Sequence, residues 1–531
     1  MELSKPDNEE SALELGTRAA SVTSFVILSK IAAFIFVGIA FVLITRILGP
    51  SGYGIYVLAT GVAGVFSSIG NFGVATALNR FIARYSGKSK QQAKVLSEGF
   101  FLIAVVGIIT TAVAFGLSGV IAGFYHNGST IAYANIFRLI SISIVLSMLF
   151  GAAYSSLVGL GKGMHAAASI TAESLSQSII GVLLAVLGFG PVAPVIGVIA
   201  GYLAGFLVGI FLIFRNGLKF TMPKLTGLKR LFSFSMPIAI SNILGSAVNN
   251  VALLLLGIFA TTFVLGNFGI ASRANYLFDI VLGSIGISLL PTFTASMGNK
   301  KTRPRTGEFY SYSVYLAFLL VAPMIFFVAI FAKQFSYTAF SSVYSLSPLY
   351  ISITSIGLLI GIAGSYASTL LISAGKVKKV LYYNSVIAIV EFILMLLLVP
   401  LFKGIGLIVL LFIVNPLLVD VLFIRKSIQV FKAKIDWKRI LHVVAANLIV
   451  GFIMYASLYY LNVSYAVVLL LAALGFIALY PPFLGIVGGV TISDINLIRK
   501  VSSNIPLIGG IINKLLDYVQ VFAKVRSRRM A

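Results

Sequence analysis

Three basic residues lie inside long apolar runs of this sequence, namely Lys30, Arg138 and Arg273. A charge in such surroundings is costly unless it faces a wet cavity or an opposite charge, so each is a candidate for binding an anion. Arginine suits phosphate groups in particular, because its planar guanidinium can donate to two oxygens at once. For Lys30 and Arg138 the alternative is a side chain that extends to the nearer membrane surface, whereas Arg273 lies deeper in its run.

Four acidic residues also fall inside apolar runs. Glu173 and Glu391 occupy roughly equivalent places in two halves of the chain that are described below, so we predict that they bind H+ or Na+ as a coupling ion. The alternative is that each is hydrogen-bonded or paired only to hold helices together. Asp279 joins this group of ion-binding candidates; it follows Arg273 by six residues, on another helix face, where a direct ion pair is not expected. Asp420 lies near the end of its run and is expected to be solvated.

The elements that carry these residues must be membrane-spanning helices. Hydrophobic residues make up 59% of the 531 positions and charged residues only 10%, whereas roughly a quarter of the residues of a soluble domain are charged. The mean hydropathy is +1.06. Only lipid can cover so much apolar surface, so the sequence predicts an all-α polytopic membrane protein. The absence of cysteine excludes disulfides, thiol catalysis and cysteine metal sites, and no cofactor is expected.

About fourteen apolar stretches are long enough to cross a membrane as helices. Twelve spans result instead if one pair of the shorter runs is re-entrant. The predicted spans are 20–45, 54–78, 95–123, 132–158, 165–188, 192–214, 232–258, 264–291, 309–332, 346–373, 380–400, 404–424, 440–461 and 464–488.

The basic residues outside these spans are distributed very unevenly. All of them except Arg46, Lys333 and Lys403 fall in loops on one side of the predicted bundle. Loops rich in lysine and arginine stay in the cytoplasm, so both termini are predicted to be cytoplasmic in a multi-pass protein of the cell membrane. The net charge of +25 would suggest nucleic-acid binding in a soluble protein, but this distribution is typical of membrane topology, and no nucleic-acid partner is expected.

A repeat is visible in the loops. Gly161-Lys162 after the fourth span and Gly375-Lys376 after the tenth are 214 positions apart. The first and seventh spans begin about 212 positions apart, at 20 and 232, and the basic loops after the second and eighth spans agree with this interval. The repeat predicts two six-helix lobes related by a pseudo-two-fold axis along the membrane normal, with the binding site between them and two accessory helices outside the repeat.

This repeat divides the chain into predicted regions. The last of them, a basic tail, either lies amphipathically on the inner membrane surface or is a frayed end held by anionic lipid. The regions are a cytoplasmic N-terminal segment (1–19), the N-lobe (20–214), a basic cytoplasmic linker (215–231), the C-lobe (232–424), a basic cytoplasmic loop (425–439), the accessory spans (440–488) and the basic amphipathic tail (489–531).

Several local motifs resemble those of one transporter family. They are RILGPSGYG at 46–54, NFG at 71–73 and RFIA at 80–83. With the layout of spans, they resemble the polysaccharide transporter and O-antigen flippase family of the multidrug/oligosaccharidyl-lipid/polysaccharide exporter superfamily. The stretch 271–291 resembles the eighth span of the related peptidoglycan-precursor flippases.

The resemblance implies a V-shaped bundle of two lobes that works by alternating access. The precursor flippases have a basic residue after a serine in their first span, and Ser29-Lys30 matches this pair with lysine in place of arginine. The acidic residue that those flippases carry further along this span has no match here, so the coupling inferred from it does not transfer.

Together the resemblance and the cations imply a flippase rather than an enzyme. Its substrate would be a sugar or oligosaccharide linked to an isoprenoid (pyro)phosphate and used in cell-surface polysaccharide synthesis. The expected partners are this lipid-linked anionic sugar, membrane lipids and a coupling ion, H+ or Na+, and a monomer is expected.

Two alternatives remain open. A cation-coupled multidrug exporter of the same superfamily typically has twelve spans and an acid in its first span. A membrane glycosyltransferase or ligase usually needs a substantial outer loop with catalytic carboxylates, whereas the predicted outer loops are short. His126, His165 and His442 lack the spacing of metal ligands, and the Gly-Lys pairs lack the upstream glycine of a nucleotide-binding loop.

Overall fold

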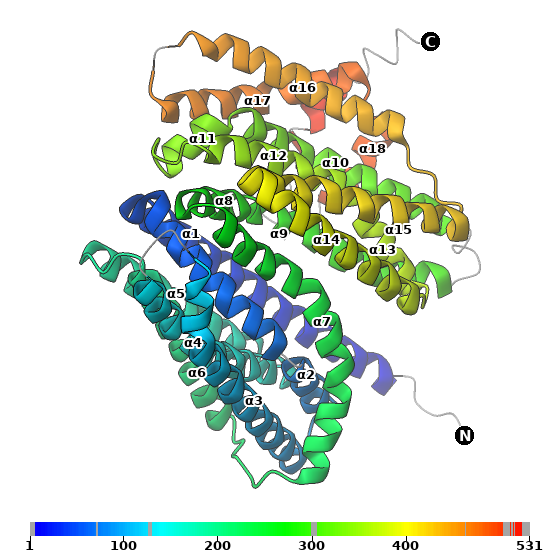
Figure 1. Cartoon of the computed structure of the whole chain (residues 1–531). Coiled ribbons are helices and arrows are strands. Elements are labelled where there is room, and N and C mark those ends of the chain that lie inside the picture. The colour runs from blue at the N-terminus through cyan, green and yellow to red at the C-terminus, as the bar shows by residue number, and fades with distance from the viewer. Residues whose placement is uncertain are drawn as a thin grey trace. The chain divides into compact units, whose positions relative to one another are not determined.

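The structure is a computed structural model that describes residues 6–70, 73–125, 130–298, 305–461, 463–502, 510, 513–514 and 516–522. Helices joined by short turns make up these residues, and they contain no strand (Figure 1). The helices are α1 (Pro6–Gly70), α2 (Val74–Arg84), α3 (Ser89–Gly123), α4 (Thr130–Gly159), α5 (Gly163–Val186), α6 (Val192–Arg215), α7 (Leu225–Phe259), α8 (Thr262–Ala274), α9 (Tyr276–Gly298), α10 (Thr306–Ile330), α11 (Ala332–Ala339), α12 (Ser347–Ile360), α13 (Ile362–Ser373), α14 (Val377–Val409), the π-helix η2 (Leu410–Val414), α15 (Asn415–Phe431), α16 (Trp437–Tyr459), α17 (Tyr465–Val487) and α18 (Ile492–Ser502).

The fold confirms the prediction of an all-α polytopic membrane protein. Each of the fourteen predicted apolar stretches coincides with helix. In the part of the chain that the structure describes, ten helices are long and apolar enough to cross a membrane. Two of these ten each cover parts of two predicted spans: α1 from Phe36 overlaps 20–45 and 54–78, and the continuous run α14–α15 contains 380–400 and 404–424. The exact number of crossings stays a prediction.

The breaks within these long helices have identifiable causes. Gly49 has φ 64° and ψ 176° inside α1, and Pro50 follows it. Glycine adopts this backbone conformation without a Cβ clash, and proline contributes no N–H to the preceding turn. In α14 the break is at Lys403, with φ 49° and ψ −128°. Both breaks fall between predicted spans.

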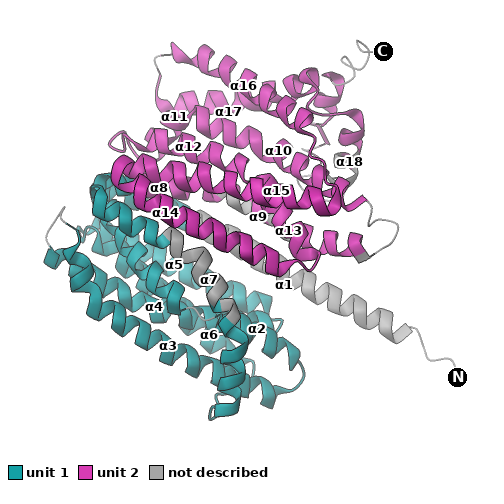
Figure 2. Cartoon of the chain, turned by 45° about the vertical axis from the view of Figure 1, so that its right-hand side comes forward, with its two compact units in different colours: residues 1–266 teal, residues 267–531 magenta. Residues whose placement is uncertain are grey.

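The chain divides into two compact units, unit 1 (Met1–Gly266) and unit 2 (Asn267–Ala531), with the boundary inside α8 (Figure 2). This grouping differs from the predicted lobes in one respect, because α7 belongs to unit 1. The reason is the close packing of α7 on α1. Gly64 of α1 is in contact with the Asn250 side chain, and a Cβ atom at Gly61 would lie only 3.0 Å from Leu253 Cβ. The lobe boundaries stay a prediction.

Small residues bring helices of unit 1 close together. Gly197, Gly201, Gly205 and Gly209 form one stripe along α6 at four-residue spacing, and the stripe faces α5. A Cβ atom at Gly201 would lie 2.8 Å from the backbone oxygen of Glu173. Such approach is typical of packed transmembrane helices, and it fixes the helix that carries Glu173.

The repeat is visible in the backbone. Gly161 after α4 and Gly375 after α13 have left-handed φ values of 70° and 73°. In each case the lysine that follows, Lys162 or Lys376, donates its backbone N–H to the carbonyl five residues earlier at 3.0 Å. This is the Schellman motif, which favours glycine because its residue has positive φ. The two Gly-Lys pairs therefore end equivalent helices in the same way.

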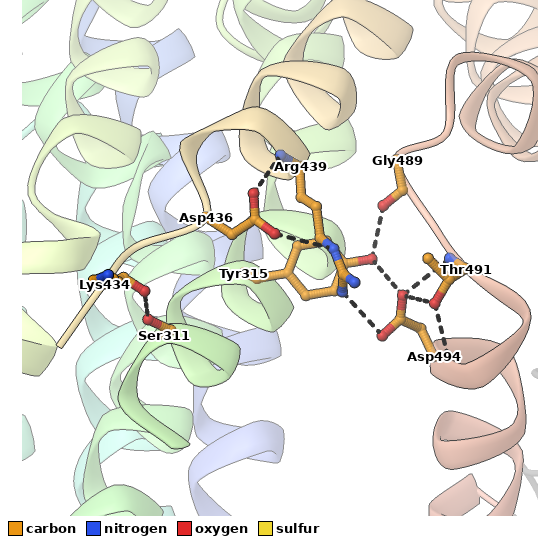
Figure 3. Close-up of polar contacts among 8 residues, drawn as sticks. All are labelled: Ser311, Tyr315, Lys434, Asp436, Arg439, Gly489, Thr491 and Asp494. Carbon is orange, nitrogen blue, oxygen red and sulfur yellow. Dashed lines mark hydrogen bonds and ion pairs between the residues drawn. The ribbon is translucent and has the colours of Figure 1, made fainter. Parts of the chain in front are cut away.

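Within unit 2, the first accessory helix, α16, is joined to its neighbours by the accessory clamp, which consists of Tyr315, Asp436, Arg439, Thr491 and Asp494 (Figure 3). Arg439 pairs with Asp436 at 3.1 Å and with Asp494 at 3.5 Å. The Tyr315 hydroxyl donates to the Gly489 carbonyl at 2.7 Å. Thr491 and Asp494 cap the first turn of α18 reciprocally, because the backbone N–H of each donates to the side chain of the other. The clamp therefore joins α10, α16 and α18.

Part of the basic tail belongs to the core of unit 2. Ile495 is completely buried there, and Leu516 and Val519 are also buried in this core. Arg499 forms an ion pair with Asp517. This stretch of the tail therefore packs on protein, a role that its basic composition did not indicate.

Candidate functional site

Two irregular backbone segments meet inside unit 2. The helix over 347–373 is interrupted at Gly361, which separates α12 from α13, and η2 separates α14 from α15. Gly357 is in contact with the backbone of Phe412 in η2, and a Cβ atom at Gly361 would lie 3.1 Å from Pro416. A π-turn inside a helix often marks a functional site, because it displaces side chains and changes the hydrogen-bonding of nearby carbonyls.

The predicted ion-binding residue Glu391 lies beside this junction. Its side chain is buried, with the whole residue 5% exposed. Asn415, the first residue of α15, donates from Nδ2 to Glu391 Oε2 at 2.6 Å. Carboxylate and amide groups are oxygen ligands for hard cations, and a carboxylate can also take a proton. Asn415 was missed at the sequence level, because an uncharged polar residue in an apolar run gives little signal.

Asp420 lies one turn further along α15. Its Oδ1 accepts a hydrogen bond from the backbone N–H of Gly364 at 2.6 Å, at the first turn of α13. The N-terminal turn of a helix has unpaired N–H groups and a partial positive charge, which stabilise a carboxylate. The buried hydroxyl of Tyr310 donates to the backbone carbonyl of Ala363, the residue before Gly364, at 2.9 Å. Asp420 is half-buried and bonded, so the expectation that it is solvated is wrong.

Glu173, the counterpart in unit 1, is half-buried on α5. Ser174 Oγ donates to Glu173 Oε2 at 2.9 Å. A Cβ atom on Gly205 would lie 2.8 Å from Glu173 Cβ, so Glu173 faces α6 as Glu391 faces α15. Each of the two glutamates therefore faces the helix that follows its own, and their equivalence in the repeat stays a prediction. Their role as ion ligands stays a prediction.

A small cavity in unit 1 is lined by residues of α1, α2, α3, α4 and α6. Its volume is about 190 Å³. The ring of Tyr202, one of its lining residues, lies 6.0 Å from the ring of Phe150, and Phe150 packs beside Gly205 as Glu173 does. Other lining residues are Ser67, Gly70, Ser147, Met148 and Gly151. The lining is apolar with a few hydroxyl groups and carries no charge of its own.

Arg273 lies in the last turn of α8, directly before a helix break, and its side chain is exposed. The break is at Asn275, which is 1% exposed and accepts from Ser355 Oγ at 3.0 Å. The Nδ2 atom of Asn275 is buried without a hydrogen-bond partner. Arg273 is thus an accessible cation beside an interrupted helix of unit 2.

The other predicted site residues have different surroundings. Arg138 is exposed on α4, with its guanidinium carbon 5.8 Å from the centre of the Phe115 ring and Nη1 3.4 Å from Asn135 Oδ1. Lys30 belongs to α1 and Asp279 to α9, but both side chains lie outside the described residues. Lys30 and Arg138 belong to unit 1, whereas Arg273 belongs to unit 2. Anion binding by these residues stays a prediction.

Glu98 was missed among the acids within spans. It lies in α3, is 4% exposed and forms an ion pair with Arg230 at 3.7 Å. An acid inside the predicted span 95–123 was the signal that could have identified it.

Comparison with known proteins agrees with this fold. A model of the family described as polysaccharide biosynthesis protein matches residues 43–348, more than half of the chain. No curated protein matches the chain in sequence. The structure of a lipid II flippase MurJ in an inward closed conformation is similar with a TM-score of 0.69 and 15% identity, over 86% of this chain and 98% of that one. An inward-facing MATE-family multidrug resistance transporter has a TM-score of 0.64 and 16% identity, over 75% and 95% of the two chains. The predicted resemblance is confirmed for family and fold.

Proposed function

Because the chain belongs to the polysaccharide biosynthesis protein family, we propose that it is a flippase for an isoprenoid-(pyro)phosphate-linked sugar or oligosaccharide. The observation that carries the proposal is the family match on a helical membrane fold similar to that of a lipid II flippase. Intermediates of polysaccharide synthesis that cross a membrane need a path for a polar head, while an isoprenoid tail is soluble in lipid.

The phosphate of such a substrate needs fixed positive charge when it leaves water. Arg273 supports this part of the proposal, because it is an exposed arginine at an interrupted helix. Its guanidinium would bind the pyrophosphate through two oxygens. Lys30 and Arg138 are proposed as further cations for the same anionic head.

Coupling to an ion gradient is proposed for Glu391 and Glu173. Glu391 is the better supported of the two, because it is buried, bonded to Asn415 and placed beside the η2 junction. Binding of H+ or Na+ at Glu391 would neutralise its charge and change its hydrogen bond with Asn415. A change at this junction would alter the packing of α14 and α15.

A second candidate function is cation-coupled export of drugs. The likeness to the inward-facing MATE-family transporter is the observation that favours it. The two functions require substrates of opposite charge. Arg273 favours the anionic substrate, since an accessible arginine repels a cationic drug.

A reconstitution experiment separates the two functions. Purified protein in liposomes would be supplied with a fluorescent undecaprenyl-pyrophosphate sugar or with a cationic dye, and protein-free liposomes would serve as the control. We expect protein-dependent translocation of the lipid-linked sugar and none of the dye. Dye transport without sugar translocation would contradict the flippase and support the exporter.

A further inference from the structure

The segment between α6 and α7 is bound to the beginning of α3 by two consecutive residues. Ser97 Oγ accepts the backbone N–H of Thr221 at 2.7 Å. The carboxylate of Glu98 lies against Gly227 in the first turn of α7, and it pairs with Arg230 Nη2 at 3.7 Å. We call Ser97, Glu98, Thr221, Gly227 and Arg230 the α7 latch. All five residues belong to unit 1.

The position of Gly227 depends on its lack of a side chain. A Cβ atom there would occupy the same space as the Glu98 carboxylate. The carboxylate also accepts a backbone hydrogen bond at Lys224, the residue that precedes α7, and Lys94 and Lys224 are its other cationic neighbours. A carboxylate at the first turn of a helix is stabilised by the helix dipole. Glu98 is therefore the anion that holds the beginning of α7.

Arg230 joins α7 to α2 as well as to α3. Its guanidinium carbon lies 5.1 Å from the centre of the Phe81 ring, and Nη1 donates to the Tyr85 hydroxyl at 3.1 Å. Phe81 in turn packs against Phe234 of α7 with ring centres 5.3 Å apart. If Arg230 separated from Glu98, its guanidinium would keep its contacts with Phe81 and Tyr85. The ion pair can therefore break without leaving the guanidinium unpartnered.

Several features distinguish the α7 latch from a permanently closed contact. Glu98 Oε2 is buried and has no hydrogen-bond partner, although most buried polar atoms have one. Its ion pair is longer than a hydrogen bond, and the Arg230 side chain is 43% exposed. Met222, just before α7, and Leu225, its first residue, are 90% and 81% exposed, whereas Leu218 and Phe220 of the same segment pack on unit 1. The exposed residues therefore lie on both sides of Lys224, at the point where the carboxylate of Glu98 holds the chain.

We propose that Glu98 holds the beginning of α7 against α3 in one state of the protein and releases it in another during each transport cycle. This inference rests on the proposed transport function. Glu98 acts here as a positioning residue, which sets the place of α7 and does not contact the substrate.

Cross-linking tests whether the α7 latch must open. The chain has no cysteine, and the hydroxyl oxygens of Ser97 and Thr221 are 3.4 Å apart, so the pair Ser97→Cys and Thr221→Cys is close enough for a disulfide. Oxidation should abolish translocation of the lipid-linked sugar, and reduction should restore it. Each single cysteine variant is the control and should be indifferent to oxidation. Full translocation by the cross-linked protein would overturn the proposal.

A labelling measurement tests the opening without any substrate. In the Ser97→Cys protein the thiol is buried, so a maleimide should react slowly. Glu98→Gln and Gly227→Ala should both increase its reaction rate, because the first removes the charge and the second displaces the carboxylate. Gly116→Ala is the matched control on α3, the helix that carries Ser97 and Glu98. A Cβ atom there would meet open space, so the rate should be unchanged.

The two measurements fail separately. Unchanged labelling in both the Glu98→Gln and Gly227→Ala proteins would overturn the α7 latch, even if the lipid-linked sugar were transported. Increased labelling in a protein that does not move the sugar would contradict the proposed substrate and leave the opening of the latch supported. A buried thiol elsewhere in unit 1, Ser156→Cys, should label at the same slow rate in all variants.

Discussion

Two acids of unit 2, the half-buried Asp420 and the buried Glu391, differ in the kind of group that pairs with their oxygens. Asp420 has a backbone N–H at the first turn of a helix, a partner that no side-chain movement supplies or removes. Glu391 depends on the amide of Asn415 alone among the hydrogen bonds found for it. An amide can present either its NH2 or its oxygen, so this pair can adapt to a change of charge. We therefore assign structural stabilisation to Asp420 and ion binding to Glu391.

Replacement of Glu391 tests this assignment. Glu391→Gln should abolish the stimulation of transport by an ion gradient, because the amide carries no charge and can neither take up H+ nor pair with Na+. Substrate binding should be retained. The measurement is sugar translocation in liposomes with and without H+ and Na+ gradients.

Glu173→Gln is the matched variant in the other half. Unchanged gradient dependence in both variants would leave the two glutamates with a structural role only.

At the residue level, the sequence offers candidates where charge interrupts an apolar run, and their roles stay predictions. Glu391 and Glu173 were identified in this way, and both face the following helix of their half. Asn415 could not be identified, since its role depends on the register shift at η2, which leaves no mark in the hydrophobic pattern. The bonding of Asp420 depends on the helix break at Gly361, and this break was not predicted either.

At the scale of elements, backbone requirements explain both what was predicted and what was not. The Gly-Lys pairs served as landmarks of the predicted repeat, and in the structure both follow a helix end, because a Schellman motif needs positive φ at its glycine. Apolar length predicted the helices themselves. The packing of the tail on unit 2 was not predicted, because it depends on Asp494, Arg439 and Tyr315 meeting from distant parts of the chain.

The accessory clamp should contribute measurably to stability. Asp494→Ala removes a buried carboxylate that caps α18 and pairs with Arg439, so the expected loss is about 1–3 kcal/mol. Tyr315→Phe removes the hydrogen bond to Gly489 at 2.7 Å and a longer contact of 3.5 Å with Asp494 Oδ2, with a loss of about 0.5–1.5 kcal/mol. The measurement is the thermal unfolding midpoint of each purified variant in detergent.

An exposed pair provides the control for the clamp. Arg305 and Glu308 are each 68% exposed, and such pairs contribute about 0–1 kcal/mol. Glu308→Ala should therefore lower the midpoint least of the three variants. A midpoint for Asp494→Ala no lower than that for Glu308→Ala would contradict the role of the clamp.

At the scale of the whole molecule, the uneven distribution of basic residues predicts the orientation in the membrane. Lys90 should be cytoplasmic, whereas Asn127 and Asn462, which lie outside the described residues, should face outward. Single cysteines at these positions can be labelled cleanly, because the chain has none of its own. In intact cells an impermeant maleimide should label the Asn127→Cys and Asn462→Cys proteins but not Lys90→Cys. Labelling of Lys90→Cys in intact cells would contradict the predicted orientation and indicate the inverted topology.

We propose that fixed cations select an anionic substrate, and a comparison of two substrates tests this selection. Translocation by the Arg273→Ala and Arg273→Lys proteins would be measured with a lipid-linked sugar phosphate and with a charge-free analogue. The conservative variant Lys30→Arg and the charge reversal Lys30→Glu would be measured in the same way. We predict that Arg273→Ala loses translocation of the phosphate but keeps that of the analogue. Arg273→Lys should recover only part of it, because lysine lacks the two-pronged guanidinium.

Lys30→Arg should behave as the unsubstituted protein and Lys30→Glu should lose transport of the phosphate. All variants must be compared at equal amounts of folded protein in the liposomes. We expect Arg273→Ala to lose translocation of the phosphate substrate selectively. An equal loss for the phosphate and the charge-free analogue would instead mean that Arg273 maintains helix packing, and it would contradict selection of the substrate by charge.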